Sequence, residues 1–136
     1  TLFGAASMTT GNFKSAVTSA ETILETEEHP YRKAEALFLK SKALTKLKKF
    51  NDARQAVSDA LDLRPKGELD VDLRLHAGDI DMAEGKPGDA IRHYAVVDSL
   101  YAKTPEEKAE ARKKVIATLK AIGTPEALEK LKNYQK

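Results

Sequence analysis

The chain has 136 residues, of which 41% are hydrophobic, 6% aromatic and 32% charged, with a formal net charge of +2. It contains no cysteine, which excludes thiol catalysis, a disulfide scaffold and any cysteine-ligated metal site. No apolar stretch reaches the length of about 18 residues that a membrane-spanning helix needs, so the sequence predicts no membrane span.

Apolar residues recur at steps of three and four along the chain, which is the spacing of amphipathic helices. No segment alternates apolar and polar residues for long enough to indicate a strand. The sequence therefore predicts an all-α protein, with helices over 1–9, 12–27, 31–48, 51–63, 70–84, 87–102, 105–121 and 125–134.

Three of the predicted helix starts carry capping residues. Thr104, followed by Pro105 and Glu107, has the pattern of a capping box with proline at the first helical position. Thr124 precedes the last helix in a similar way, and we expect Asp70 to cap the helix that follows Gly67.

The chain repeats itself every 37 residues. Ala16, Ala53, Ala90 and Ala127 are spaced by that interval, and each follows a turn and opens a helix. The same register relates Gly4, Ser41, Gly78 and Val115 upstream of the turns. A repeat of this length that contains two helices predicts an α-solenoid of stacked antiparallel helix pairs.

The repeat boundaries fall near 1–30, 31–67, 68–104 and 105–136, which gives about three and a half units in one domain. The first unit holds only half of its first helix, and the chain does not begin with methionine. We therefore expect the chain to be a fragment of a longer protein. It contains no recognisable targeting segment, so the sequence leaves its compartment open.

The repeated positions resemble the tetratricopeptide repeat family. The second unit carries the family's pattern of large and small residues at Leu37, Ser41, Leu44, Phe50, Ala53, Val57, Ala60 and Pro65. The third unit fits well through Gly78, Ala90, Tyr94 and Val97, whereas Val115 replaces the small residue in the fourth. The period also departs from the family's norm of about 34 residues.

The resemblance implies a scaffold that binds a protein or peptide on a concave face lined by the first helix of each unit. The implied groove residues of the second unit are Glu35, Phe38, Lys42, Thr45 and Lys46. Those of the third unit are Asp72, Leu75, Asp79, Met82 and Ala83, and those of the first are Thr1, Ala5, Met8 and Thr9. The alternative for Leu75 and the two methionines is that they pack between helices.

Charge is unevenly distributed along the chain. Residues 32–54 carry eight basic and two acidic side chains, a net charge of +6, whereas residues 59–89 carry a net charge of −5 and residues 103–136 a net charge of +4. Most of these charges suit a solvated helix surface, but they also suit electrostatic steering of a partner that carries both signs.

One subtype of the family binds acidic C-terminal tails through a clamp of Lys, Asn and Arg. In this sequence the clamp positions hold Ala5, Leu39, Asp72 and His76, so we expect no such clamp.

No catalytic motif, cofactor motif or phosphate-binding loop occurs, so the sequence predicts no enzyme and no cofactor. Asp72, His76 and Asp79 have the spacing of a metal half-site, but such spacing arises often by chance, and we predict no metal site. Two alternatives to a peptide scaffold remain open. One is self-assembly into a homo-oligomer through the edge of the repeats. The other is RNA binding, which the acidic middle and the small net charge disfavour, so we predict no nucleic-acid partner.

Overall fold

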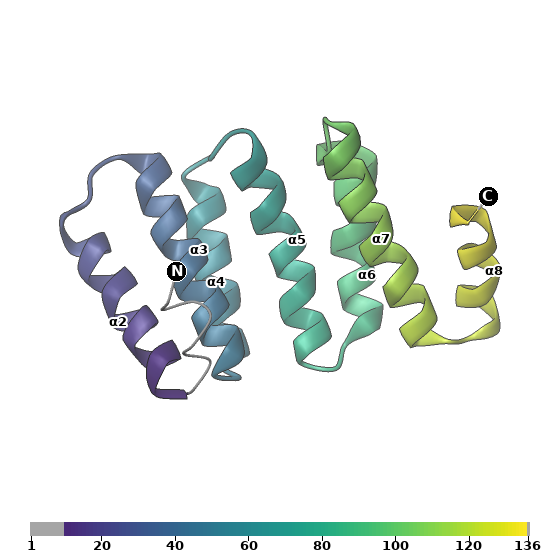
Figure 1. Cartoon of the computed structure of the whole chain (residues 1–136), viewed down its shortest axis with the longest axis horizontal. Helices are drawn as coiled ribbons and strands as arrows, with labels where there is room; N and C mark the ends of the chain where they lie inside the picture. Colours follow the sequence, from purple (N-terminus) through teal and green to yellow (C-terminus); the bar gives the residue numbers. More distant parts are fainter. Residues whose placement is uncertain (1–9, 136) are drawn as a thin grey trace. The chain divides into compact units, whose positions relative to one another are not determined.

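The computed structural model describes residues 10–135, and over these residues it is all-helical. The helices are α2 (Thr10–Thr26), α3 (Pro30–Lys46), α4 (Phe50–Asp62), α5 (Glu68–Ala83), α6 (Pro87–Val96), the π-helical turn η1 (Val97–Tyr101), α7 (Pro105–Ile122) and α8 (Pro125–Tyr134) (Figure 1). The predicted all-α class is confirmed for this part of the chain. The predicted helix 1–9 and the groove residues Thr1, Ala5, Met8 and Thr9 lie outside the described residues.

The helix boundaries follow the predicted local chemistry closely. The Thr104 hydroxyl accepts a hydrogen bond from the Glu107 amide at 3.1 Å, and a Glu107 carboxylate oxygen accepts one from the Thr104 amide at 3.2 Å. This capping box and the Thr124 cap, which accepts from the Ala127 amide at 3.1 Å, were both predicted. The prediction for Asp70 was wrong, because α5 already begins at Glu68 and Asp70 lies within its first turn.

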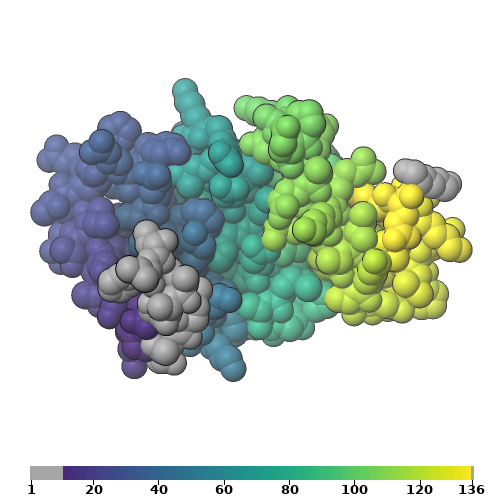
Figure 2. Space-filling model, viewed as in Figure 1, coloured from purple at the N-terminus to yellow at the C-terminus, as the bar shows by residue number. Residues whose placement is uncertain are grey.

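The described residues divide into two compact units, one ending at Leu73 and the other beginning at Arg74, inside α5. In the first unit α3 packs against both α2 and α4, and in the second unit α7 packs against α6 and α8. A short turn joins α3 to α4, which makes the two helices antiparallel neighbours. Figure 2 shows that side chains fill the space between adjacent helices within each unit.

The core of the first unit combines small and large apolar side chains. Its members are Ala34, Leu37, Ala56, Ala60, Leu69 and Leu73, which come from α3, α4 and the first turns of α5. The alanines have no side chain beyond Cβ, so they let the helix axes approach closely, and the leucines fill the remaining space. Ser41 sits in the same packed region, where its hydroxyl donates to the Ala53 carbonyl at 2.8 Å. This contact fixes α3 directly against the start of α4.

The 37-residue repeat reappears in the geometry of two turns. After α3, the Lys48 amide donates to the Thr45 carbonyl and the Lys49 amide donates to the Leu44 carbonyl. After α5, the same two bonds form 37 residues later, from Gly85 to Met82 and from Lys86 to Asp81. The residue at the centre of each turn takes a left-handed backbone conformation, with φ of 63° at Lys48 and 82° at Gly85. Equivalent positions in the sequence thus build equivalent turns.

Lys48 occupies a left-handed conformation that glycine adopts without steric cost, as Gly85 does in the equivalent turn. We predict that Lys48→Gly raises the free energy of unfolding by up to about 1 kcal/mol, measured by urea denaturation. Lys49→Gly is the matched control, because Lys49 has a φ of −94° and gains nothing from glycine. Equal effects of the two substitutions would contradict the argument.

Candidate functional site

A shallow pocket of about 300 Å³ lies in the first unit, between α3 and the beginning of α5. Its lining comes from one stripe of α3 and from the first turns of α5, and consists of Tyr31, Glu35, Phe38, Leu39, Lys42, Glu68, Leu69 and Asp72. The α3 residues follow one another at steps of four, three, one and three positions, which places them on one face of the helix. The pocket is therefore a direct product of helical periodicity on α3 and of the packing of α5 beside it.

The pocket has an apolar floor and an exposed apolar rim. Leu69 is only 6% exposed and belongs to the core, and the half-buried Phe38 packs against that core. At the rim, Tyr31 and Leu39 each keep 42% of their surface exposed. A side chain entering the pocket would meet carbon atoms below and beside it, which is the arrangement that ordinary ligand sites use for affinity.

Charged groups surround this apolar surface unevenly. Three carboxylates, those of Glu35, Glu68 and Asp72, line the pocket together with a single ammonium group, that of Lys42. The Lys42 Nζ atom lies 4.3 Å from the centre of the Phe38 ring, in a cation–π contact. The lining therefore carries a formal excess of two negative charges.

Four of the groove residues implied by the sequence meet in this pocket: Glu35, Phe38, Lys42 and Asp72. Thr45 and Lys46 lie further along α3 and do not line it. The Thr45 hydroxyl donates to the Ser41 carbonyl at 2.8 Å, within its own helix. Lys46 is exposed in the last turn of α3.

The remaining predicted residues lie in the second unit and serve packing or polar contacts there. Leu75 is only 5% exposed, so its side chain belongs to the protein interior, as the alternative interpretation had it, and offers no surface to a partner. Met82 is half-buried, and its sulfur atom lies 3.9 Å from the Thr118 hydroxyl oxygen. Asp79 is held by two neighbours, described next.

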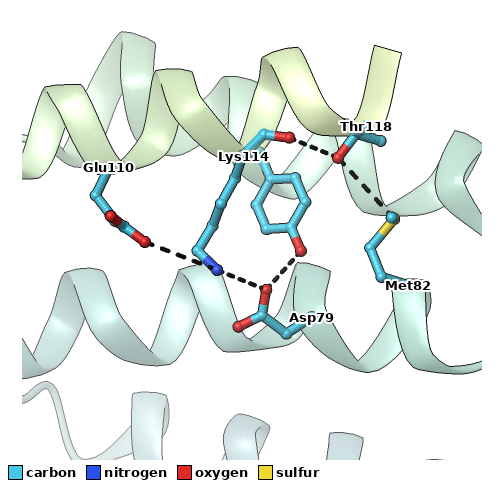
Figure 3. A network of polar contacts seen from close by, with 6 residues as sticks. Asp79, Met82, Glu110, Lys114 and Thr118 are labelled. Carbon is cyan, nitrogen blue, oxygen red and sulfur yellow. Dashed lines mark hydrogen bonds and ion pairs between the residues drawn. The ribbon is translucent and has the colours of Figure 1, made fainter. Parts of the chain in front are cut away.

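Asp79 is the centre of a polar network that links α5, α6 and α7 (Figure 3). One of its carboxylate oxygens accepts a hydrogen bond from the Tyr94 hydroxyl at 2.5 Å and pairs with Lys114 at 3.0 Å. Lys114 also lies 3.9 Å from Glu110, one turn earlier on α7. Burial, and then the hydrogen bond to Asp79, raises the pKa of Tyr94 above its ordinary value, so the phenol stays protonated and donates. These groups bind one another, which is the arrangement of a structural tie.

Sequence reasoning missed four pocket residues. Tyr31 and Leu39 lie one helical turn from Glu35 on either side, so extending the α3 stripe by four residues in each direction would have found them. No sequence signal pointed to Glu68 or Leu69, because their roles depend on α5 beginning two residues earlier than predicted and packing beside α3.

Two further features are absent from the described residues, a metal-binding cluster and a membrane-spanning helix. Across residues 10–135, no three His, Asp or Glu side chains gather in a way that could hold a metal ion. None of the helices in that range is both long and apolar enough to cross a membrane.

Comparison with known proteins returned no matching family model, no matching curated protein and no matching solved structure.

Gly78 packs directly under the Tyr94 ring that belongs to this network. A Cβ atom built at Gly78 would lie 2.5 Å from Tyr94 Cε1, which is too close for two carbon atoms. We predict that Gly78→Ala lowers the free energy of unfolding by about 1–2 kcal/mol, since the ring is pinned by Asp79 and overpacking costs about that much. Chemical denaturation followed by circular dichroism measures the change.

Gly88→Ala on α6 is the control for Gly78→Ala, because no atom lies within 4 Å of a Cβ built at Gly88. It should leave stability unchanged or raise it slightly, as alanine is the better helix former. Tyr94→Leu removes the ring, so in that background Gly78→Ala should lower the free energy of unfolding by less. A penalty that persists unchanged there would show that the Tyr94 ring is not its cause.

Proposed function

We propose that this chain is a protein-interaction scaffold of the tetratricopeptide type, an α-solenoid that binds a peptide or protein partner and carries out no chemistry. The observation that carries the proposal is the pocket in the first unit. It gathers Phe38, Lys42 and Asp72, which are residues that the family resemblance implies for the peptide-binding face.

The placement of the pocket supports the proposal. Its walls are α3 and the start of α5, which are the first helices of two successive 37-residue units. In a helical-repeat scaffold these helices line the concave face. The repeated turns at Lys48 and Gly85 support the same architecture, because equal turns at equal intervals are what a solenoid requires.

The pocket is also held in shape before any partner arrives. Phe38 packs against the core, and α3 is fixed to the start of α4 by the buried bond from Ser41 to the Ala53 carbonyl. A partner therefore needs to order few groups of the scaffold on binding, which lowers the entropic cost of association. The acidic lining of the pocket favours a protein partner over RNA, whose phosphates the three carboxylates would repel.

The test is binding of the purified chain to an array of immobilised ten-residue peptides, followed by fluorescence anisotropy with the best binders. We expect Leu39→Ser to weaken binding about fivefold and Phe38→Ala about tenfold or more, because both remove apolar surface from the pocket. Leu39 is exposed, so its substitution leaves the fold intact even where Phe38→Ala loosens it.

Leu128→Ser is the matched control for Leu39→Ser, since Leu128 is 46% exposed on α8, outside the pocket. It should not change the affinity. Equal losses from the two substitutions, or an array on which no peptide binds above background, would contradict a peptide-binding pocket. Light scattering over a range of concentrations separates this function from self-assembly, which predicts a mass that rises with concentration.

A further inference from the structure

We infer that the pocket selects partner segments in which an apolar side chain stands next to lysine or arginine. This inference rests on the proposed function and adds the chemistry of the partner to it. It is carried by the pairing of an apolar floor with an excess of carboxylates in one small space.

The apolar half of the recognition follows from the size and the lining of the pocket. A volume of about 300 Å³ lies at the lower end of ligand sites, so it accommodates a side chain rather than a large cofactor. Phe38, Leu39 and Leu69 supply the carbon surface that such a side chain would bury. Leucine or an aromatic residue is the natural occupant, because burial of apolar area drives the contact.

The cationic half follows from the placement of the carboxylates. Glu68 and Asp72 are four residues apart on α5, so these like charges face the same side of one helix and repel each other slightly. Glu35 adds a third carboxylate from α3. Glu68 is favoured by its place in the first turn of α5, near the positive end of the helix dipole. Glu35 lies beyond the first turn of α3, so no helix dipole accounts for its place on the lining.

Lys42 shows where a cation sits in this pocket, because its ammonium group lies over the Phe38 ring. It is the one cationic group among the lining residues, which also include the carboxylates of Glu35, Glu68 and Asp72. Glu35 and Glu68 are both exposed, so a lysine or arginine of the partner can reach them from solvent. The carboxylates then supply charge-assisted hydrogen bonds beside the apolar contact.

The first experiment uses synthetic decapeptides that differ only around a central leucine. One probe flanks the leucine with two lysines, a second with two glutamates and a third with two serines, and a fourth keeps the lysines but replaces the leucine with serine. We expect the lysine–leucine probe to bind about tenfold more tightly than the glutamate probe, with the serine probe between them. The fourth probe should bind weakly, since charge alone does not fill the floor.

The second experiment changes the pocket. Glu35→Gln combined with Glu68→Gln should weaken binding of the lysine–leucine probe about fivefold and leave the serine probe nearly unchanged. The matched control, Glu25→Gln with Asp62→Asn, removes the same charge from exposed positions of the same unit outside the pocket and should have no effect. Lys42→Met keeps the side chain's length and removes its charge, so it should strengthen binding of the lysine–leucine probe about twofold. Raising the salt concentration should shrink all of these differences.

The outcomes separate this inference from the proposed function. If the probes bind the pocket, as judged by loss with Leu39→Ser, but lysine and glutamate probes bind equally, the cationic preference is wrong and the peptide scaffold stands. If the glutamate probe binds best, or if Lys42→Met weakens the lysine probe, the inference is overturned as well. If light scattering shows concentration-dependent dimers that Glu35→Gln with Glu68→Gln abolishes, the occupant is a second copy of this chain and the inference falls.

Discussion

The structure depends on close approach between helices at small side chains. Ala34, Ala53 and Ala90 are fully buried, and at Gly78 even a methyl group would collide with the Tyr94 ring. Where a side chain at such a contact is polar, it is satisfied across the interface, as Ser41 is by the Ala53 carbonyl. Close approach brings many apolar atoms into contact for each turn of helix, which compensates for a sequence with few aromatic residues. Larger residues at these positions would separate the helices, and the pocket and the Asp79 network, which depend on the helix spacing, would change.

The pocket is one consequence of that spacing. α3 is held against α4, and the start of α5 packs on the same core. The outward stripe of α3 and the first turns of α5 therefore lie beside each other, with their polar and apolar side chains in a fixed arrangement. Phe38 connects the core to the pocket. It packs against the core, and it lines the pocket, where Lys42 lies over its ring. In the second unit a close contact between helices supports a polar network and not a pocket. There Tyr94 reaches across Gly78 to Asp79, and Lys114 closes the link from α7, so polar atoms that could have formed a site are consumed in joining three helices.

The helices were predictable because their information is local. Periodicity and capping residues such as Thr104 and Thr124 placed the predicted helix starts within two residues of those observed. The candidate site was predictable in part, since Phe38, Lys42 and Asp72 follow from a repeat register and from which helix face it presents. The same register also selected Leu75, which is buried, and Asp79, which is engaged by Tyr94 and Lys114. The predicted residues that line the pocket differ from Leu75 and Asp79 in which helices pack against them. Those neighbours depend on contacts between residues far apart in the sequence. The sequence predicted one continuous helix over 87–102, whereas the structure ends α6 at Val96 and continues in a π-helical turn at Val97–Tyr101.

The net charge of the pocket lining differs in sign from the net charge of the sequence segment that contains most of α3. Residues 32–54 carry a net charge of +6, yet the pocket, half of whose lining comes from that stretch, is acidic. Part of the basic charge is directed elsewhere, as Lys40 pairs with Glu21 of α2 at 3.5 Å and Arg32 lies 3.9 Å from Glu27. Glu35, the stretch's one glutamate, lies on the pocket face, where α5 adds Glu68 and Asp72 from the acidic segment that follows. In the proposed function a partner meets the charges of one face at contact range, whereas exposed charges more than about 10 Å away are largely screened by salt. The charge of the pocket is therefore decided by which side chains share a helix face, and a count over residues 32–54 alone gives it the wrong sign.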